Sequence, residues 1–375
     1  KGKPLALADD KGAADGEKIA LLELALERLP PDVPDRALVL GTLCAELAFG
    51  STLERRRALA DEALAIAKAT GDDAIVVRTL NHMAFSLTLP WLLESSLEWT
   101  AEALMRAERL GDPMQLYFAA MYRATAAVRA IDIVEADRCY AIAGELVRQL
   151  GLPPLKWEYG FHMSKRAQLA GDLADAERLA GEAATIGASC GQPDAQTFFG
   201  VQLAGVSWMR GTMGDLAPLL EMMMHANPGL PTIRASLAMA FAQGERLGDA
   251  LRILGEFAAT NYALPEDAAW LNGMTEYADA AINCSDLHTA PSLYDLLSPW
   301  ADHFSAAGGL TAEGPVCLYL GGLATVLSRH DDAERHLSVA AELCGRHAMK
   351  YFAALTALRR AQLILHRGDK DPDTA

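Results

Sequence analysis

Four glycines spaced 40 residues apart are the feature that most constrains the fold of this chain. Each follows a helix-compatible stretch and begins a short break that contains Asp or Pro: Gly71, Gly111, Gly151 and Gly191. Glycine just past a helix supplies a left-handed cap, and a proline soon afterwards prevents the helix from continuing. Regular spacing of helix ends is typical of repeat proteins, in which stacked units share one continuous core.

A second set of turns lies midway between these glycines. Gly171-Asp172 is a tight turn that leads into a new helix, and Ile131 and Gly211 stand at the same phase. Each unit is therefore helix, turn, helix, turn. Small residues also recur at fixed phases, which allows the two helices of a unit to cross closely. One series is Cys44, Ala84, Ala124, Ser164 and Ala204, and the other is Ala63, Ala103, Ala143 and Ala183.

These patterns predict an all-α fold, a right-handed α-solenoid of helix-turn-helix units with a period near 40 residues. We expect helix throughout residues 17–366 and no sheet. We expect residues 1–14 to be disordered or tag-derived, 15–231 to hold regular repeats, and 232–375 to hold less regular repeats continuous with the first part. Eight full helix pairs with a half unit at each end account for the chain. The half units are either native caps or, as we expect, the result of excision from a longer protein.

Charge and cysteine content exclude several classes of function. The formal net charge of −16 disfavours binding to nucleic acid, because most of that affinity comes from neutralising phosphates with Lys and Arg. The same charge disfavours anionic membranes, and no apolar stretch is long enough to span a bilayer. The six cysteines are scattered and none forms a CxxC pair, which indicates a reduced, cytoplasmic protein.

Part of the repeat resembles the tetratricopeptide pattern. The unit around Gly171 matches that pattern at its small positions, Ser164, Ala176 and Ala183. It departs from the pattern at the large aromatic positions, where Gly160 and Ala167 stand. The resemblance implies a tetratricopeptide-like fold.

The longer unit and the Ala- and Leu-rich segments 57–65 and 176–180 resemble a narrower group, the helical-repeat region of large bacterial signalling ATPases. That group includes LuxR-type regulators similar to the maltose-regulon activator, and actinobacterial fusions of a nucleotide cyclase, an ATPase module and a repeat region. The resemblance implies that the repeats sense an inducer or a partner and control the ATPase and output domains. A free-standing scaffold for protein partners is the alternative, and an enzyme with an unrecognised site is a third hypothesis.

No catalytic or cofactor motif is present in the sequence. It lacks the GxxxxGK[ST] phosphate loop, a GxGxxG after a strand, HExxH, GxSxG and a basic recognition helix. We therefore expect no catalytic residues, no cofactor, no metal and no tight ATP binding. The nearest approach to a metal site is a group that we interpret as surface histidines beside a core cysteine: His330, His336, Cys344 and His347.

Two further features have structural explanations. Met222-Met223-Met224 could form a soft groove for a peptide, but it is more typical of the core of a second helix. The paired aspartates Asp72-Asp73 and Asp331-Asp332 stand at turns, where Asp caps helices.

The concave face of the predicted solenoid is the better candidate site. First helices of the units line that face, and aromatic and polar residues recur there at repeated phases. We predict a groove for a protein, a peptide or a small effector, centred on units two to five. Its candidate residues are Arg78, Asn81, Phe85, Phe118, Met121, Phe161, Lys165, Phe198 and Trp208. The alternative is that these aromatics pack between units. A one-residue error in the assumed phase would place a side chain in the core instead of the groove.

Overall fold

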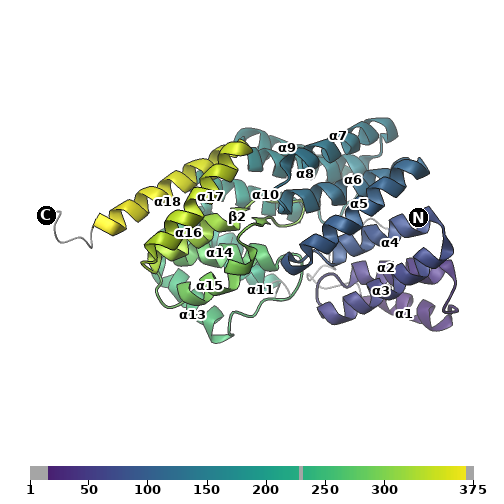
Figure 1. The fold of residues 1–375 in the computed structure, drawn as a ribbon, viewed down its shortest axis with the longest axis horizontal. Helices are drawn as coiled ribbons and strands as arrows, with labels where there is room; N and C mark the ends of the chain where they lie inside the picture. The colour runs from purple at the N-terminus through teal and green to yellow at the C-terminus, as the bar shows by residue number, and fades with distance from the viewer. Residues whose placement is uncertain (1–15, 228–230, 369–375) are drawn as a thin grey trace.

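The computed structural model describes residues 16–227 and 231–368, and nearly all of their regular structure is α-helical (Figure 1). The expectation for residues 1–14 lies outside the described residues. The helices are α1 (Gly16–Arg28), α2 (Pro34–Glu46), α3 (Leu53–Thr70), α4 (Asp73–Ser86), α5 (Leu93–Leu110), α6 (Pro113–Arg129), α7 (Ile133–Leu150), α8 (Pro153–Ala170), α9 (Leu173–Ser189), α10 (Ala195–Arg210), α11 (Ala217–Ala226), α12 (Thr232–Gln243), α13 (Leu247–Ala259), α14 (Trp270–Asn283), α15 (Ala290–Leu297), α16 (Val316–Val326), α17 (His330–Arg346) and α18 (Lys350–Gly368). Short 3-10 turns η1 (Pro90–Leu92), η2 (Met213–Leu216) and η3 (Ser298–Trp300) join some of them.

The four periodic glycines have the left-handed conformation that the sequence predicts. Gly71, Gly111 and Gly151 cap α3, α5 and α7 with φ of 70°, 66° and 65°. Gly191 has φ of 75° and lies two residues beyond the end of α9. Asp72 then begins α4, because its carboxylate accepts a hydrogen bond from the Ala74 amide at 2.8 Å. The expected alternation of helix and turn is therefore confirmed in this half.

The small residues lie where the two helices of a unit meet. Ser164 on α8 donates a hydrogen bond to the carbonyl of Ala176 on α9 at 2.7 Å. Cys44 on α2 makes the equivalent contact with the carbonyl of Arg56 on α3 at 3.3 Å. A larger side chain at these positions would force the helices apart, which explains why the phase repeats.

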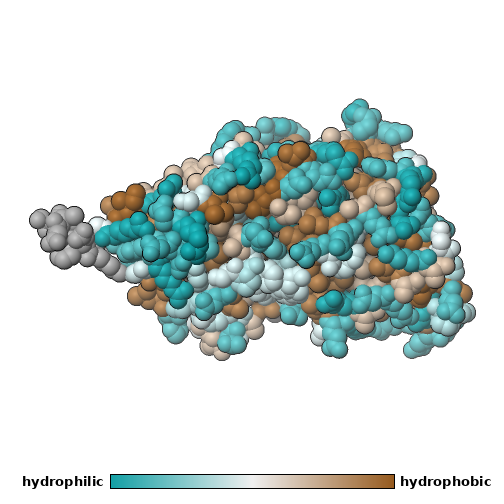
Figure 2. Space-filling view, in the orientation of Figure 1, coloured by the Kyte–Doolittle hydropathy of each residue, from teal (hydrophilic) through white to brown (hydrophobic). Residues whose placement is uncertain are grey.

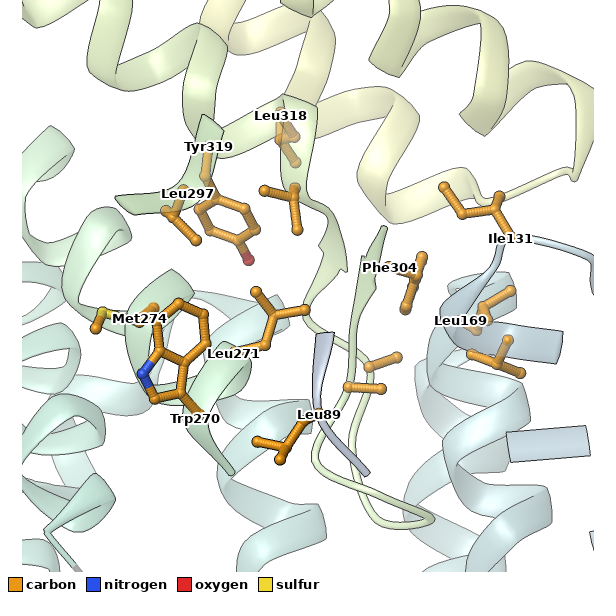
Figure 3. Packing of buried hydrophobic residues seen from close by; sticks show 14 of the residues in the cluster. Leu89, Ile131, Leu169, Trp270, Leu271, Met274, Leu297, Phe304, Leu318 and Tyr319 are labelled. Atoms are coloured by element: carbon orange, nitrogen blue, oxygen red, sulfur yellow. The ribbon is translucent and has the colours of Figure 1, made fainter. Parts of the chain in front are cut away.

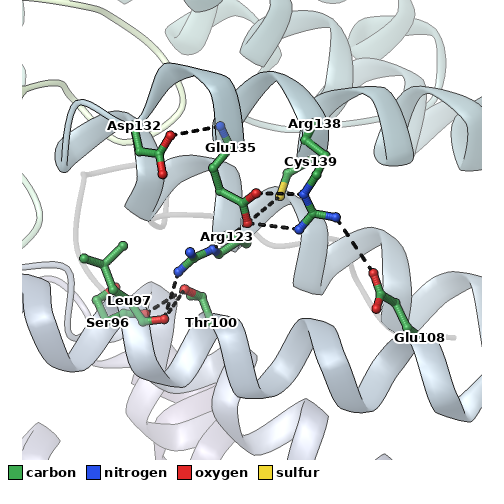
Figure 4. A network of polar contacts seen from close by, with 9 residues as sticks. All are labelled: Ser96, Leu97, Thr100, Glu108, Arg123, Asp132, Glu135, Arg138 and Cys139. Atoms are coloured by element: carbon green, nitrogen blue, oxygen red, sulfur yellow. Dashed lines mark hydrogen bonds and ion pairs between the residues drawn. The ribbon is translucent and has the colours of Figure 1, made fainter.

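Polar side chains also join consecutive helices. Arg123 on α6 donates to Glu135 on α7 at 2.9 Å and to the carbonyl of Leu97 on α5 at 2.9 Å (Figure 4). Arg138 binds the same carboxylate at 2.7 Å. Hydrogen bonds from Arg138 and Arg123 lower the pKa of Glu135 to about 2, despite the opposing effect of its partial burial. Three neighbouring helices are thereby fixed to one another.

The expectation of helix throughout with no sheet is wrong between α15 and α16. The chain there forms β1 (Phe304–Ser305), turns through residues 306–313 and returns as β2 (Gly314–Pro315). The two strands pair antiparallel, with Phe304 opposite Pro315. Gly308, Gly309 and Gly314-Pro315 all oppose helix formation, so the local sequence accounts for the interruption.

This interruption lies inside the molecule. Phe304 is fully buried and lies between Leu169 and Ile131 on one side and Leu271 of α14 on the other (Figure 3). At the C-terminal end of the fold in Figure 1, the start of α18 lies beside α8 and α10. Lys350 at the start of α18 pairs with Asp172 at 2.6 Å, which places these distant segments in contact.

Residues 306–313, here called the inner loop, are held by side chains of the first half. Lys165 Nζ donates to the carbonyl of Gly308 at 3.1 Å, and Gln202 Nε2 donates to the carbonyl of Leu310 at 3.1 Å. Gln168 accepts from the amide of Ala312 at 3.4 Å. Buried backbone groups need such partners when they have no helix or sheet neighbours. The inner loop is thus an integral part of the core.

Across the two described ranges, no helix has the length and apolar character needed to cross a membrane. All six cysteines are free thiols.

Candidate ligand-binding site

An apolar cavity of about 350 Å³ lies between the first half of the chain and the inner loop. Helices α4, α6, α8 and α10 supply its wall, and these are the first helices of four successive units. The inner loop and the turn at Ala268-Ala269, just before α14, close the opposite side. Both halves of the protein therefore contribute to one cavity.

Aromatic side chains form most of the apolar wall. Trp157 stacks on Phe198 with ring centroids 5.4 Å apart, and Phe161 meets both rings edge-on at 5.2 and 5.1 Å. Flat rings held by one another keep their positions when a ligand enters. The remaining large apolar lining side chains are Phe49, Phe85, Phe118, Met121, Leu155 and Leu310.

One stripe of α6 crosses the cavity from end to end. Its lining residues recur at the helical spacings of three and four: Phe118, Met121, Tyr122, Thr125, Ala126 and Arg129. Arg129 is the last of them and the last residue of the helix. A helix rises about 1.5 Å per residue, so Arg129 lies roughly 10 Å along the axis from Tyr122.

Arg129 is a buried cation with no partner in the described part of the chain. It is 5% exposed, and burial is the only influence on its pKa, with no hydrogen-bond or ion-pair partner among the described residues. Burial lowers its pKa to about 10, so it is still charged at neutral pH. A buried charge without a counter-ion is destabilising, which makes this residue unusual in a core.

The other end of the cavity holds an acidic group. Burial raises the pKa of Glu158 to about 7, and the nearby hydroxyl of Tyr117 opposes this shift. Burial also raises the pKa of Tyr122, with a further contribution from Glu158. The cavity is therefore polarised, with a carboxyl group and phenols at one end and a guanidinium at the other.

His162 lies under the inner loop at the wall of the cavity. Burial, together with the nearby Lys165, lowers the pKa of His162 well below its usual value, so the ring is neutral at pH 7. Its Nδ1 has no hydrogen-bond partner among the described residues. The backbone of Gly309 lies so close that an added Cβ would overlap the imidazole ring.

Gly309→Ala is expected to displace the inner loop and to lower stability by about 1–3 kcal/mol, the usual effect of overpacking. Amide hydrogen exchange should accelerate in residues 306–313. Gly255→Ala is the control, because nothing lies within 4 Å of a Cβ on Gly255. Unchanged exchange in the Gly309 variant would show that the loop accommodates a side chain there.

Five of the nine predicted groove residues line the cavity. They are Phe85, Phe118, Met121, Phe161 and Phe198. They fall at three phases of the 40-residue repeat on one face of the first helices, and those helices stack in register.

The other four predicted residues do not line the cavity. Arg78 is exposed on α4, outside it. Asn81 is buried within the helix packing. Trp208 is also buried, donates to Asp279 at 3.3 Å and meets the ring of Tyr351 at 5.4 Å. Lys165 does not offer a charge to an open groove, since it is 0% exposed and the inner loop covers it.

The sequence analysis missed several lining residues that the structure brings to the same place. Arg129 could have been predicted from the sequence, because it lies one helical turn beyond Thr125 on the same face of α6. Trp157 lies one position before the phase that Phe118 and Phe198 share, which is within the error of a phase estimate. Leu310 could not have been predicted in this way, because it belongs to a segment without helical periodicity.

Two of the four residues considered as possible metal ligands have separate partners. His336 meets the hydroxyl of Tyr294 at 3.1 Å, and His330 meets His366 at 3.3 Å. Within the described ranges no group of three or more His, Cys, Asp or Glu side chains could hold a metal ion. In the methionine run, Met222 is exposed on α11, whereas Met224 packs partly against the core.

No known protein-family model matches this chain, and no protein of curated function shows significant similarity to it.

Proposed function

We propose that this chain is a non-catalytic sensor, a right-handed solenoid of tetratricopeptide-like repeats that binds a small effector in its inner cavity. In this proposal, binding controls an attached output such as an ATPase-linked transcription regulator or a nucleotide cyclase. The cavity itself is the observation that carries the proposal. Its volume and its apolar lining with a few polar groups are typical of small-molecule sites.

The position of the cavity supports a regulatory role. Its wall comes from four consecutive units, and its closing side comes from the inner loop and the start of α14. A ligand in contact with both parts would favour the arrangement in which they are close together. Lys165 and Gln202 already join the two parts through the inner loop. A ligand therefore needs to add only a small binding free energy to strengthen a contact that is already present.

The face of the molecule shown in Figure 2 supports a small effector over a protein partner. On the face shown in Figure 2, hydrophobic areas are divided by hydrophilic side chains. Exposed apolar patches that bind proteins are normally larger and continuous. The apolar cavity is therefore the stronger candidate for recognition.

The neutral fluorescent probe N-phenyl-1-naphthylamine tests whether the cavity accepts small apolar molecules. We expect one probe to bind per chain, because the aromatic wall offers a preformed apolar site. Thr125→Trp should weaken that binding at least about 10-fold by filling the cavity, since even 1.4 kcal/mol of lost contact has this effect. Fluorescence titration of the purified chain measures both values.

Thr185→Trp is the matched control. Each threonine donates to the carbonyl four residues before it, Thr125 at 3.1 Å and Thr185 at 2.9 Å, but Thr185 is exposed on α9. The control variant should bind the probe like the unaltered chain. Absence of probe binding by the unaltered chain would refute the proposal, as would equal binding by the Thr125 variant.

A further inference from the structure

We propose that the effector is an amphipathic organic acid, a flat apolar body carrying one carboxylate that pairs with Arg129. This inference rests on the proposed function, and it adds the chemical class and the orientation of the ligand. Four observations support it, taken in turn below.

The first observation is the unpaired guanidinium. Arg129 lines the cavity, is nine-tenths or more buried and has no hydrogen-bond or ion-pair partner among the described residues. The cost of burying a charge falls when an opposite charge with good hydrogen-bond geometry lies beside it. A planar guanidinium offers two parallel N–H donors that match a carboxylate, so an organic acid would complete this site.

The second observation concerns the other ionisable groups near that end. Lys165 already donates to the carbonyl of Gly308, and burial lowers its pKa to about 7, with Arg129 lowering it further and Glu313 opposing the shift. His162 is neutral at pH 7. Glu313 accepts a hydrogen bond from Thr311, and burial raises its pKa to about 7. Arg129 is therefore the permanent cation at this end.

The third observation is the opposite end of the cavity. Glu158 lies there near Tyr117, whose hydroxyl donates to the carbonyl of Leu155 at 3.4 Å. A carboxylate placed near Glu158 would be repelled or would require Glu158 to be protonated. The ligand's acidic group is thus directed toward Arg129 and its apolar or weakly polar end toward Glu158.

The fourth observation is the shape of the wall between these ends. Phe161 and Phe198 meet at 84°, and Trp157 lies nearly parallel to Phe198 at 27°. Such rings present both flat faces and edges to a ligand, which suits an aromatic or similarly flat body. A long flexible chain would lose more conformational entropy on entering the same space.

A pair of probes that differ only in charge tests the inference. 1-Naphthylacetate and 1-naphthylacetamide should each displace N-phenyl-1-naphthylamine from the unaltered chain, and the acid should act at a concentration at least about 10-fold lower than the amide. Arg129→Met should abolish this preference, and Arg129→Lys should retain part of it. Circular dichroism checks that each variant is folded.

A control variant identifies the group responsible. Arg78→Met removes an exposed arginine from another first helix, outside the cavity, and should leave the preference intact. If Arg129→Met does not fold, acid and amide are compared in Arg129→Lys instead. Lysine cannot form the bidentate pair, so an unchanged preference for the acid in that variant would contradict the inference.

The outcomes separate this inference from the proposed function. Equal displacement by acid and amide in the unaltered chain overturns the inference and leaves the cavity as a small-molecule site. A preference that survives Arg129→Met, or that disappears in Arg78→Met, overturns the assignment to Arg129. Failure of the neutral probe to bind overturns both the inference and the proposed function.

Discussion

Replacing Asp279 with alanine is expected to lower the free energy of unfolding by about 3–5 kcal/mol, the usual result of removing one partner from a buried ion pair. Asp279 on α14 and Arg359 on α18 are 3% and 5% exposed, and their side chains lie 3.0 Å apart. Asp279 also accepts hydrogen bonds from Trp208 on α10 at 3.3 Å and from Asn283 at 3.0 Å. Its loss would leave a buried cation and two unpaired donors among three helices.

Urea unfolding of the purified chain measures this effect. The matched control is the double replacement Asp279→Leu with Arg359→Met, which removes both charges and keeps much of the volume. We expect the double variant to be much closer to the unaltered chain than the single variant, because no uncompensated charge is left behind. A single variant with an unchanged midpoint would show that solvent reaches Arg359 and replaces its partner.

Gly171→Val is expected to cost more than valine at any comparable helix end. Gly171 has φ of 80°, a conformation that costs a β-branched residue about 1–3 kcal/mol. An added Cβ would also lie 2.8 Å from the backbone nitrogen of Tyr351 and 3.1 Å from Cβ of Lys350. Backbone cannot yield easily, so overpacking adds about 1–3 kcal/mol.

Gly151→Val separates the two contributions. Gly151 has φ of 65°, and nothing lies within 4 Å of the position that a Cβ would occupy there, so this variant reports backbone strain alone. Chemical unfolding should place the stability of the Gly171 variant below that of the Gly151 variant by the cost of overpacking. Equal losses would mean that α18 moves away from Gly171 without cost.

Local sequence explains the helices and their ends. Gly71, Gly111 and Gly151 adopt positive φ because no Cβ opposes it, and Asp72 caps the next helix through a contact two residues away. Such interactions are complete within a few residues, so periodicity alone reveals them. The small residues at Cys44 and Ser164 follow from the same period, because neighbouring helices of one unit must meet at one phase.

The candidate site was only partly predictable. Phe118, Met121 and Phe161 line the cavity, because helical phase fixes which face of the helix a residue occupies. The same phase argument placed Lys165 and Trp208 in an open groove, where the structure instead covers or packs them. Helical phase predicts the direction in which a side chain points, but it does not show which segment of the chain packs against that side chain.

The sequence by itself determined the helical composition, the 40-residue unit and the inward face of the first helices, because each depends on contacts within a unit. Tertiary structure decided which segments of the chain pack against that face of the first helices. The inner loop binds Lys165 and Gln202 across 143 and 108 residues of sequence, a separation over which no local pattern operates. Only this return of the chain closes the cavity and leaves Arg129 buried without a partner among the described residues, because burial depends on every segment that packs around a side chain.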